Sequence, residues 1–246
     1  MPKKLGKLPP KRDNRTLKLA KYLDFDTFPP IPERIVWSGP VSEWTMMKND
    51  EVGDCAIAAV GHIVQTWTAN ESKEVILSDD QIVDAYAEIC GYDKENNQND
   101  GGCIMLDVLN FWRKNGIETH DIEGFVSVNP KNKKEIMAAL YLFGSVYIGL
   151  NLPLYIQDMD EWMYPSPTGA DDIPGSWGGH AVMIVDADQE SLQIVSWGKR
   201  MKMGWAFFHK YCDEAYCVFG PEDWATDGAA PNGFDIEQLR RNLNKL

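Results

Sequence analysis

The stretch from Lys48 to Val60, with the sequence KNDEVGDCAIAAV, constrains the fold of this chain more than any other. A polar loop turns at Gly53, and the residues after Cys55 are small or apolar and suit a buried helix. A cysteine in the first turn of a helix faces unpaired backbone N–H groups and the positive end of the helix dipole, and both lower the pKa of its thiol. The segment therefore indicates a nucleophilic cysteine, with a small buried core cysteine as the alternative.

The residues before this stretch resemble the start of a mature papain-family cysteine peptidase. The chain carries Ile31-Pro32-Glu33 and then Trp37, and Cys55 follows Ile31 by 24 residues, which is the family's spacing to its nucleophile. Six residues before the nucleophile, the family has a Gln whose amide helps to form the oxyanion hole. Asn49 occupies that position here, with the same amide on a shorter arm. The resemblance implies that Cys55 is the catalytic thiol and that Asn49 assists it.

A histidine far along the chain fits the role of the base. His180 begins an alternating segment, GHAVMIV, which is similar to the family's His-Ala-Val strand, whose His is the catalytic base. In the family, an Asn on the following strand orients that His within Asn-Ser-Trp-Gly. Here the segment reads Val195-Ser196-Trp197-Gly198, so Val195 replaces the Asn. Because side chains alternate along a strand, we expect Ser196 to point to the face opposite that of residue 195, and so away from His180, unless a bulge intervenes.

The resemblance also implies a substrate cleft. Asn99-Asp100-Gly101-Gly102 is similar to the family's Cys-Asn-Gly-Gly, where the glycines pair with an extended peptide. Ile104 and Ala181 match positions that line the family's main apolar specificity pocket, and Trp197 matches the indole beside the His. The alternative for each of these residues is ordinary loop or core packing.

The order of elements favours an α+β fold, with a helical N-terminal half and an antiparallel β C-terminal half. The resemblance makes this a two-lobed papain-like domain over residues 31–246, after a basic arm at 1–30. Its expected parts are a mainly helical lobe at about 31–130, a mainly β lobe at about 131–225, and a C-terminal helix at 226–246. Periodicity and turn signals predict helices at 55–67, from Ser78, at 106–114 and at 133–142, and strands at 145–150, 180–185, 192–197, 204–208 and 216–219.

Composition limits the cellular compartment in which we expect this chain. The chain has 246 residues, and no apolar run approaches the ~18–20 residues that a membrane span needs. The N-terminus lacks the apolar region of a secretory signal. Five cysteines, at spacings that suggest no framework, predict no disulfide. We therefore expect a reducing compartment, either a cytoplasm or a particle assembled there.

Charge is distributed unevenly. Residues 1–22 carry eight Lys and Arg residues and one acid, Asp13, whereas the whole chain has a net charge of −13. The arm lacks the apolar groups for a core, so contacts must order it: with its own acidic body, with a neighbouring copy or with another protein of an assembly. The acidic body argues against nucleic acid. The arm also looks too short for the inhibitory pro-segment that the papain family usually carries.

Two functions of different classes follow. Cys55, His180 and Asn49 favour a cysteine peptidase that acts on extended peptide and needs no cofactor. Val195 and the basic arm favour a non-catalytic papain-fold protein that docks in a larger assembly through residues 1–22. A zinc site at His209, Cys212 and Cys217 is a third candidate, but it lacks a convincing fourth ligand. The sequence therefore leaves open whether the chain is an enzyme.

Overall fold

The computed structural model describes residues 3–165, 169–220 and 234–245. The helices are α1 (Cys55–Asn70), α2 (Asp79–Cys90), α3 (Met105–Asn115), α4 (Lys133–Phe143), α5 (Trp205–Tyr211) and α6 (Ile236–Leu243). The strands are β1 (Ile35–Val36), β2 (Gly124–Ser127), β3 (Val146–Leu152), β4 (Glu161–Trp162), β5 (Gly178–Ala187), β6 (Ser191–Ser196), β7 (Lys199–Gly204) and β8 (Cys212–Phe219).

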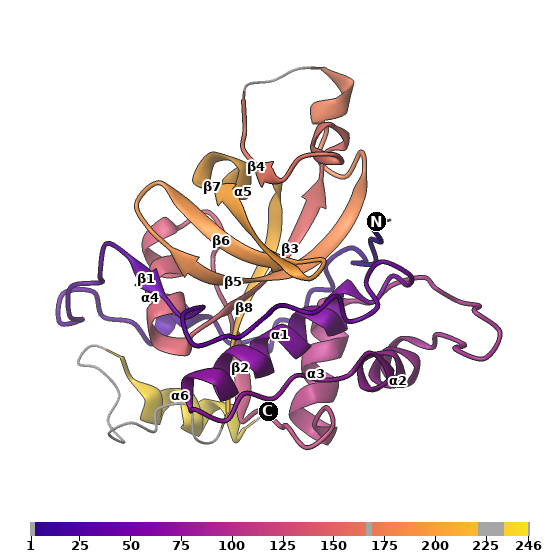
Figure 1. The fold of residues 1–246 in the computed structure, drawn as a ribbon. Coiled ribbons are helices and arrows are strands. Elements are labelled where there is room, and N and C mark those ends of the chain that lie inside the picture. Colours follow the sequence, from indigo (N-terminus) through magenta and orange to yellow (C-terminus); the bar gives the residue numbers. More distant parts are fainter. Residues whose placement is uncertain (1–2, 166–168, 221–233, 246) are drawn as a thin grey trace.

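The strands make one sheet in the order β2-β8-β3-β5-β6-β7-β4, with β1 paired to β5. The pairs are antiparallel except for β4 with β7. Because side chains alternate along a strand, β5 faces two cores. Ala181 and Met183 pack toward α1, α2 and α3, whereas Val182 and Ile184 pack toward α4. The helical first half therefore covers one face of the sheet that the second half builds (Figure 1), and the predicted α+β architecture is confirmed.

Helix α1 lies between the sheet and the other N-terminal helices, and its residues from Cys55 to Thr66 are all buried. Small residues permit this close packing: a Cβ on Gly61 would lie 2.6 Å from the sulfur of Met47. The hydroxyl of Tyr147 on β3 donates to the carbonyl of Ala56 at 2.9 Å. This bond fixes the first turn of α1, and with it Cys55, against the centre of the sheet.

The predicted helix after Ser78 forms with a complete capping box. The Ser78 hydroxyl accepts from the backbone N–H of Gln81, and the Gln81 side chain accepts from the backbone N–H of Ser78. This reciprocal pair satisfies two N–H groups that a helix start leaves without partners. Helices α2, α3 and α4 each end at a glycine with positive φ, namely Gly91, Gly116 and Gly144, as expected for such ends.

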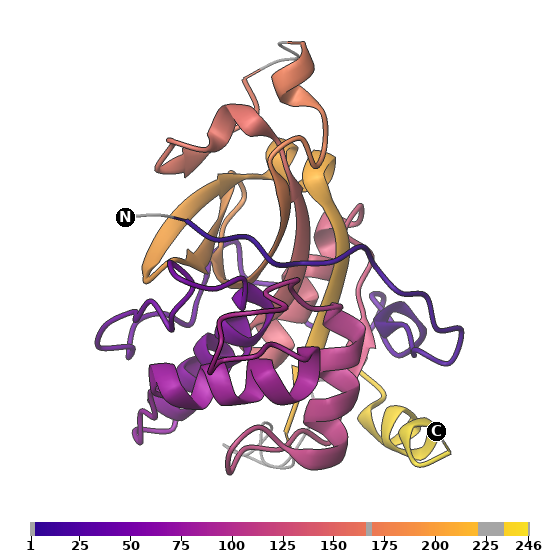
Figure 2. The same cartoon turned by 90° about the vertical axis from the view of Figure 1, so that its right-hand side faces the viewer.

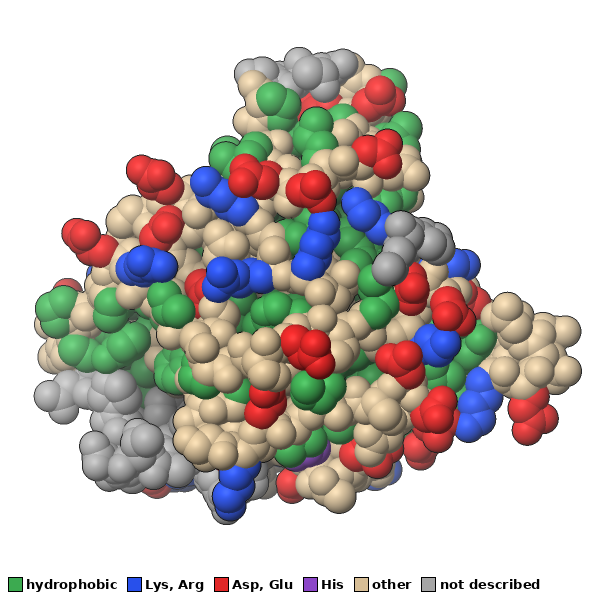
Figure 3. All heavy atoms as spheres, viewed as in Figure 1, with side chains coloured by type: hydrophobic (Ala, Val, Ile, Leu, Met, Phe, Trp, Pro, Cys, Tyr) green, Lys and Arg blue, Asp and Glu red, His purple; other side chains and the backbone are tan. Residues whose placement is uncertain are grey.

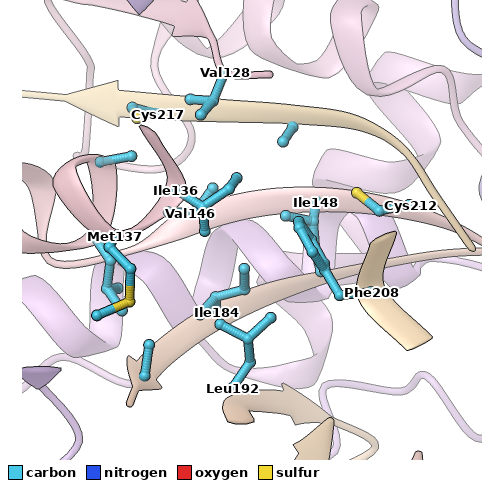
Figure 4. Close-up of a cluster of buried hydrophobic side chains, with 14 of the residues drawn as sticks. Val128, Ile136, Met137, Val146, Ile148, Ile184, Leu192, Phe208, Cys212 and Cys217 are labelled. Carbon is cyan, nitrogen blue, oxygen red and sulfur yellow. The ribbon is translucent and has the colours of Figure 1, made fainter. Parts of the chain in front are cut away.

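The second core lies between α4 and the strands β3, β5 and β8. Figure 4 shows side chains from these elements meeting there, including Ile136, Val146, Ile148 and Ile184. All four are fully buried. Burial of a side chain of this size contributes about 1.5–3 kcal/mol, so this core makes the second half of the chain a rigid support for β5 and β6.

The predicted strand at 204–208 is wrong. Strand β7 ends at Gly204, and the residues after it form α5. Aromatic residues favour strands in general, but a strand would turn Phe207 and Phe208 to opposite faces. As a helix, the segment buries both of them together with Tyr211, one turn further on. Burial on one helical face outweighs the local strand preference.

The face of the molecule in Figure 3 has acidic and basic side chains interspersed over both halves. It offers no broad basic surface of the kind that phosphate backbones attract. In the described residues, no helix is both long and apolar enough to cross a membrane.

The N-terminal arm runs across the body between the helices and the sheet, as the indigo trace of Figure 2 shows. At the other end of the chain, α6 buries Leu239 and Leu243. It forms part of the helix that we predicted at 226–246, of which residues 226–233 and 246 lie outside the described residues. Both termini thus pack on the body through specific side chains.

Candidate active site

The thiol of Cys55 is enclosed at the first residue of α1, where the side chain is 1% exposed. Its sulfur accepts a hydrogen bond from the backbone N–H of Ala181, at 3.4 Å. Burial raises the pKa of Cys55 to about 12, although the Ala181 and Gly6 backbone N–H groups act in the opposite direction. In this structure, then, the cysteine is a neutral thiol at neutral pH, and the helix N-terminus alone does not make it a thiolate.

His180 lies on β5 directly before Ala181, the residue whose backbone N–H bonds the thiol. Its ring stacks on the indole of Trp197, with centroids 4.3 Å apart and planes 13° apart. Burial, and then the charge of Lys3, lowers the pKa of His180 to about 3. The ring is therefore neutral at neutral pH, and its Nδ1 has no hydrogen-bond partner among the described residues.

The other ring nitrogen, Nε2, lies 2.8 Å from the hydroxyl oxygen of Ser196. Our expectation that Ser196 points away is wrong, because Val195 pairs with Met183 and shares its face of the sheet. His180 and Ser196 alternate onto the opposite face, and Val195 is buried on the α1 side. Ser196 thus lies on the same face as His180 and contacts its imidazole, whereas Val195 lies on the other face.

Asn49 is buried in the loop before α1, but its amide points within the loop. The Nδ2 atom donates to the carbonyl of Val52 at 3.2 Å and to Oδ1 of Asp54 at 3.0 Å. These bonds use both of its hydrogens. Burial raises the pKa of Asp54 to about 8, so this carboxyl is mostly protonated at neutral pH. Asn49 can donate toward a reacting carbonyl only after one of these bonds opens.

Residues 3–8 of the arm pass over this site between the helices and the sheet (Figure 2), and they contact both sides of the cleft between them. Gly6 and Lys7 both donate their backbone N–H to the carbonyl of Gly179, at 3.2 and 3.0 Å. On the other wall, Cys103 donates to the Gly6 carbonyl at 2.7 Å and accepts from Leu8 at 2.8 Å. The arm therefore bridges both walls of the cleft as an extended peptide, and a segment of six residues is long enough to cover it.

Two further bonds hold the arm near Cys55 and His180. Lys4 donates its backbone N–H to the Asn49 carbonyl at 3.1 Å, and its own carbonyl accepts from the indole of Trp197 at 3.1 Å. Trp197 thus contacts both His180 and the peptide in the cleft. This is the placement that the family resemblance implied for it.

The glycines of the cleft permit a close approach of the two backbones. A Cβ on Gly102 or Gly179 would overlap the arm backbone at Gly6 or Lys7. Gly101 differs, because a Cβ there would meet nothing closer than 3.9 Å. The structure thus brings Gly102 to the cleft peptide, while Gly101 is exposed in the turn beside it.

Ile104 is half-buried and precedes α3.

The prediction of no disulfide is wrong, because Cys90 and Cys103 are bonded. The bond joins the end of α2 to the cleft wall that pairs with the arm. Sequence spacing gave no sign of it, because only the folded loop at residues 91–102 brings the two residues together. The pairing removes the argument that we drew from cysteine usage for a reducing compartment. Cys55, Cys212 and Cys217 are free and buried.

The described residues contain no group of three or more His, Cys, Asp and Glu side chains that could hold a metal ion. In the zinc candidate, Nδ1 of His209 bonds the Pro130 carbonyl, and the Cys212 thiol bonds the Glu214 carbonyl. These groups therefore serve local packing.

The basic arm pairs with the acidic body of its own chain. Lys11 contacts Asp107 at 2.7 Å on the surface, and Lys7 contacts Asp213 at 2.8 Å with its side chain fully buried. The sequence allowed contacts of the arm with its own body, with a neighbouring copy or with another protein. This structure contains the contacts with its own body.

The fold is similar to that of solved cysteine proteases. Xylellain, a cysteine protease from Xylella fastidiosa, matches with a TM-score of 0.68 at 14% identity, over 89% of this chain and 98% of that chain. Bromelain protease from Ananas comosus, in complex with E64, matches with a TM-score of 0.56 at 14% identity, over 77% and 100%. The ragweed pollen cysteine protease Amb a 11, in its proform, matches with a TM-score of 0.54 at 15% identity, over 77% and 67%.

No protein-family model matches the sequence, and a comparison with curated proteins found no match. The solved structures are distant in sequence but agree throughout most of the chain. The chain therefore has the papain-like cysteine protease fold, as the sequence motifs predicted.

Proposed function

We propose that this protein is a cysteine peptidase that acts on extended peptide, with Cys55 as the nucleophile and His180 as the base. One observation carries the proposal. The thiol accepts from the backbone N–H of Ala181, the residue after His180, and the Ser196 hydroxyl lies 2.8 Å from Nε2 of that imidazole. In this proposal the nucleophile comes from α1, the base from β5 and the orienting group from β6, which are the three roles that an activated thiol needs.

The chemistry needs the arm to leave the cleft. His180 with its proton on Nε2 donates to Ser196 and keeps Nδ1 as an acceptor for the thiol proton. The resulting thiolate attacks the carbonyl carbon of the substrate, and the imidazolium then protonates the leaving amine. A water, deprotonated by the same His180, hydrolyses the thioester and restores the thiol. The backbone N–H of Cys55, at the helix start, is the first donor for the oxyanion, and Asn49 is the second.

The arm does not occupy the cleft as a substrate. The backbone N–H of Gly6 donates to the Gly179 carbonyl and lowers the pKa of Cys55, and the Gly6 carbonyl oxygen accepts from Cys103 on the wall. A scissile carbonyl would instead turn its carbon to the sulfur and its oxygen to the oxyanion donors. We therefore interpret this structure as a latent form, in which the arm excludes both water and substrate from the thiol.

The test is to force the arm out. A Cβ on Gly6 would overlap the carbonyl of Gly53, and overpacking of this kind costs about 1–3 kcal/mol, or about 5–150-fold in the equilibrium for arm release. Gly6→Ala should therefore raise the rate at which E-64 labels Cys55, and should raise hydrolysis of a fluorogenic peptide library. Gly39→Ala is the matched control, because a Cβ there meets nothing within 4 Å.

Labelling that stays slow in Gly6→Ala and falls on no single cysteine would contradict the proposal. Cys55→Ala should abolish both signals and shows whether another thiol reacts. Mass spectrometry of the labelled peptide identifies the site.

Ser196 is proposed as a positioning residue that acts through His180. Ser196→Ala should lower kcat/KM by about 10²-fold, the scale of a small misplacement of a catalytic group. It should also shift the limb of the pH profile that reports His180 to lower pH, since the imidazolium loses an acceptor. Ser196→Thr should restore part of the rate. Val195→Ala, on the other face of the sheet, is the control that should leave the pH profile in place.

The second candidate is a non-catalytic protein that keeps this fold for a structural role, with residues 1–22 as its contact to an assembly. The burial of both the thiol and the imidazole favours it, because neither group is ionised at neutral pH in this form. It predicts that the Gly6→Ala variant is labelled at Cys55 but hydrolyses no peptide, and that the released arm binds another protein. Hydrolysis that depends on Cys55 excludes it.

A further inference from the structure

Next to the thiol, the cleft opens into a pocket that holds the side chain of Lys7. We call it the Lys7 pocket; its lining residues are Gly149 and Asn151 of β3 and Asp213, Glu214 and Tyr216 of β8. Lys7 follows Gly6, whose backbone N–H donates to the Gly179 carbonyl and lowers the pKa of Cys55. The pocket therefore lies one residue along the cleft peptide from the reacting atom.

The pocket encloses an ammonium group completely. Nζ of Lys7 lies 2.8 Å from Oδ2 of Asp213 and 3.3 Å from Oε1 of Glu214, and no part of the Lys7 side chain is exposed. Lysine is rarely buried unless it is paired, because its charge loses hydration. Two carboxylates at these distances replace that hydration, so the pocket is built around a cation.

The strand below the pocket leaves room for the stem of the lysine. A Cβ on Gly149 would overlap the Cδ and Cε atoms of Lys7 and would also reach the side chain of Glu214. Any other residue at this position of β3 would block the entrance. The absence of a side chain at Gly149 thus shapes a channel that fits a straight aliphatic stem.

The carboxylates are held in place by neighbours other than Lys7. Nδ2 of Asn151 donates to Oδ2 of Asp213 at 2.9 Å, and the hydroxyl of Tyr216 donates to Oε2 of Glu214 at 3.0 Å. Among the described residues, Oδ1 of Asp213 has no hydrogen-bond partner, and Oε1 of Glu214 has only the ion pair with Lys7 at 3.3 Å. Glu214 is 6% exposed. When the arm leaves, an acidic pocket remains with unsatisfied oxygens facing the cleft.

We infer that the Lys7 pocket selects substrates, so that this protein cleaves peptides with a lysine next to the residue that sits on Cys55. The inference rests on the proposed peptidase function. The arm then acts as a competitor that carries the preferred side chain. A neutral side chain in the pocket would leave buried carboxylate oxygens unpaired, which is the situation that gives a site its strongest discrimination.

The pocket should prefer lysine to arginine. The ammonium fits between two oxygens with no exposed surface, whereas a planar guanidinium is larger and needs a wider fork of acceptors. An acidic side chain should be excluded by the two carboxylates. The predicted order is therefore lysine, arginine, norleucine and glutamate.

The first experiment measures kcat/KM with the full chain carrying Gly6→Ala and Lys7→Met, so that the arm neither fits the cleft nor brings a cation. Matched fluorogenic peptides differ at one scanned position, with lysine, arginine, norleucine or glutamate. At the position that reaches the pocket, lysine should exceed norleucine by about 10²-fold or more. In Glu214→Gln this ratio should fall at least about tenfold. Equal rates for lysine and norleucine at every position would overturn the inference.

The second experiment does not depend on catalysis. In full-length protein with Cys55→Ala, Gly6→Ala and Lys7→Met, a labelled peptide of residues 3–9 is titrated by fluorescence anisotropy, with lysine or norleucine at the position of Lys7. The lysine peptide should bind at least about tenfold more tightly, and high salt or Glu214→Gln should reduce the difference. Equal affinities would sink the inference.

The two readouts separate the proposals. Selective binding without any hydrolysis keeps the lysine pocket and rejects the peptidase. Hydrolysis that depends on Cys55 but ignores lysine keeps the peptidase and rejects the pocket. The peptide comparisons need no change in the carboxylates, so they remain decisive if Glu214→Gln fails to fold.

Discussion

Residues 3–8 and residues 17–23 belong to the same arm, but the body holds them by different forces. In the cleft, the arm is held by backbone hydrogen bonds and by the buried charge of Lys7. At the other end, Leu19 and Tyr22 are buried in the apolar core beside α4. Water can replace hydrogen bonds and solvate charges, but it cannot replace apolar burial. The comparison indicates a permanent anchor at 17–23 and a releasable end at 3–8.

The anchor has backbone support of its own. The carbonyl of Leu17 accepts from the backbone N–H of Ser127 at 2.8 Å, and the carbonyl of Tyr22 accepts from that of Asp235 at 3.0 Å. These bonds tie the arm to the start of the sheet and to the C-terminal helix. Release of the cleft end would therefore leave the arm attached, with its local concentration at the cleft still high.

The largest expected effect is on the anchor. Leu19 has no exposed surface, and a buried Leu→Ala change typically costs about 2–5 kcal/mol. Leu19→Ala should lower the free energy of unfolding by this amount in urea titration. Leu8→Ala is the control, because Leu8 is 37% exposed and should cost far less. A Leu19→Ala protein as stable as wild type would show that 17–23 is no anchor.

The second prediction concerns the releasable end of the arm, residues 3–8. Lys7→Met leaves Glu214 buried without its cation, a change that costs about 3–5 kcal/mol when a buried pair cannot relax. Release of the arm relieves this cost, so the rate of Cys55 labelling should rise by about 10²-fold while the unfolding free energy changes little.

Lys11→Met is the matched control, because its pair with Asp107 is on the surface, and surface pairs contribute about 0–1 kcal/mol. Labelling that rises equally in both variants would mean that charge density, and not the buried pair, holds the arm.

Acid should release the cleft end before the anchor. The pKa of His180 is lowered to about 3 by burial and by the charge of Lys3, and release of the arm, which carries Lys3, should return it toward the ordinary ~6.5. Because the covered form binds the proton less well, arm docking is at full strength above pH ~6.5 and is lost as the pH falls toward 3. Between pH 7 and 5, docking should weaken by about 30-fold.

Hydrogen exchange of the Leu8 amide, compared with that of Ser127 at the anchor, measures this difference. His62 is also buried, with a pKa lowered to about 4, so acid lowers the stability of the whole fold as well. Exchange of the Ser127 amide measures this global loss. A His180→Asn variant should lose the selective effect at Leu8. Equal acceleration of both amides would contradict a releasable end.

The sequence located the parts of the site that depend on local motifs. Cys55 required only a loop and a helix start, and His180 only an alternating strand with a recognisable neighbour. Ser196 was missed because its face depends on the register of β5 with β6, and a shift by one residue reverses every side chain. The pairing of Met183 with Val195, which decides the face, is a property of the folded sheet.

Long-range contacts explain the other differences. Arm composition predicted a segment that needs outside contacts, but not which of them, because Lys7 meets Asp213 across the whole chain. Helix α5 was mistaken for a strand because local propensity cannot weigh the burial of Phe207 and Phe208. The helices α1 to α4 were predicted well, because their apolar spacing is written within each segment, and α2 also carries its capping box at Ser78.

The smallest predicted effect tests whether polar contacts matter at the anchor at all. The hydroxyl of Tyr22 accepts a hydrogen bond from Nδ2 of Asn242 at 2.9 Å, while its ring is buried in the core. Tyr22→Phe removes only the hydroxyl, and loss of one such bond costs about 0.5–1.5 kcal/mol. Unfolding in urea should detect this loss, and the rate of Cys55 labelling should not change. If Tyr22→Phe instead raised labelling as Lys7→Met does, the two ends of the arm would be coupled, and the arm would leave the body as one unit.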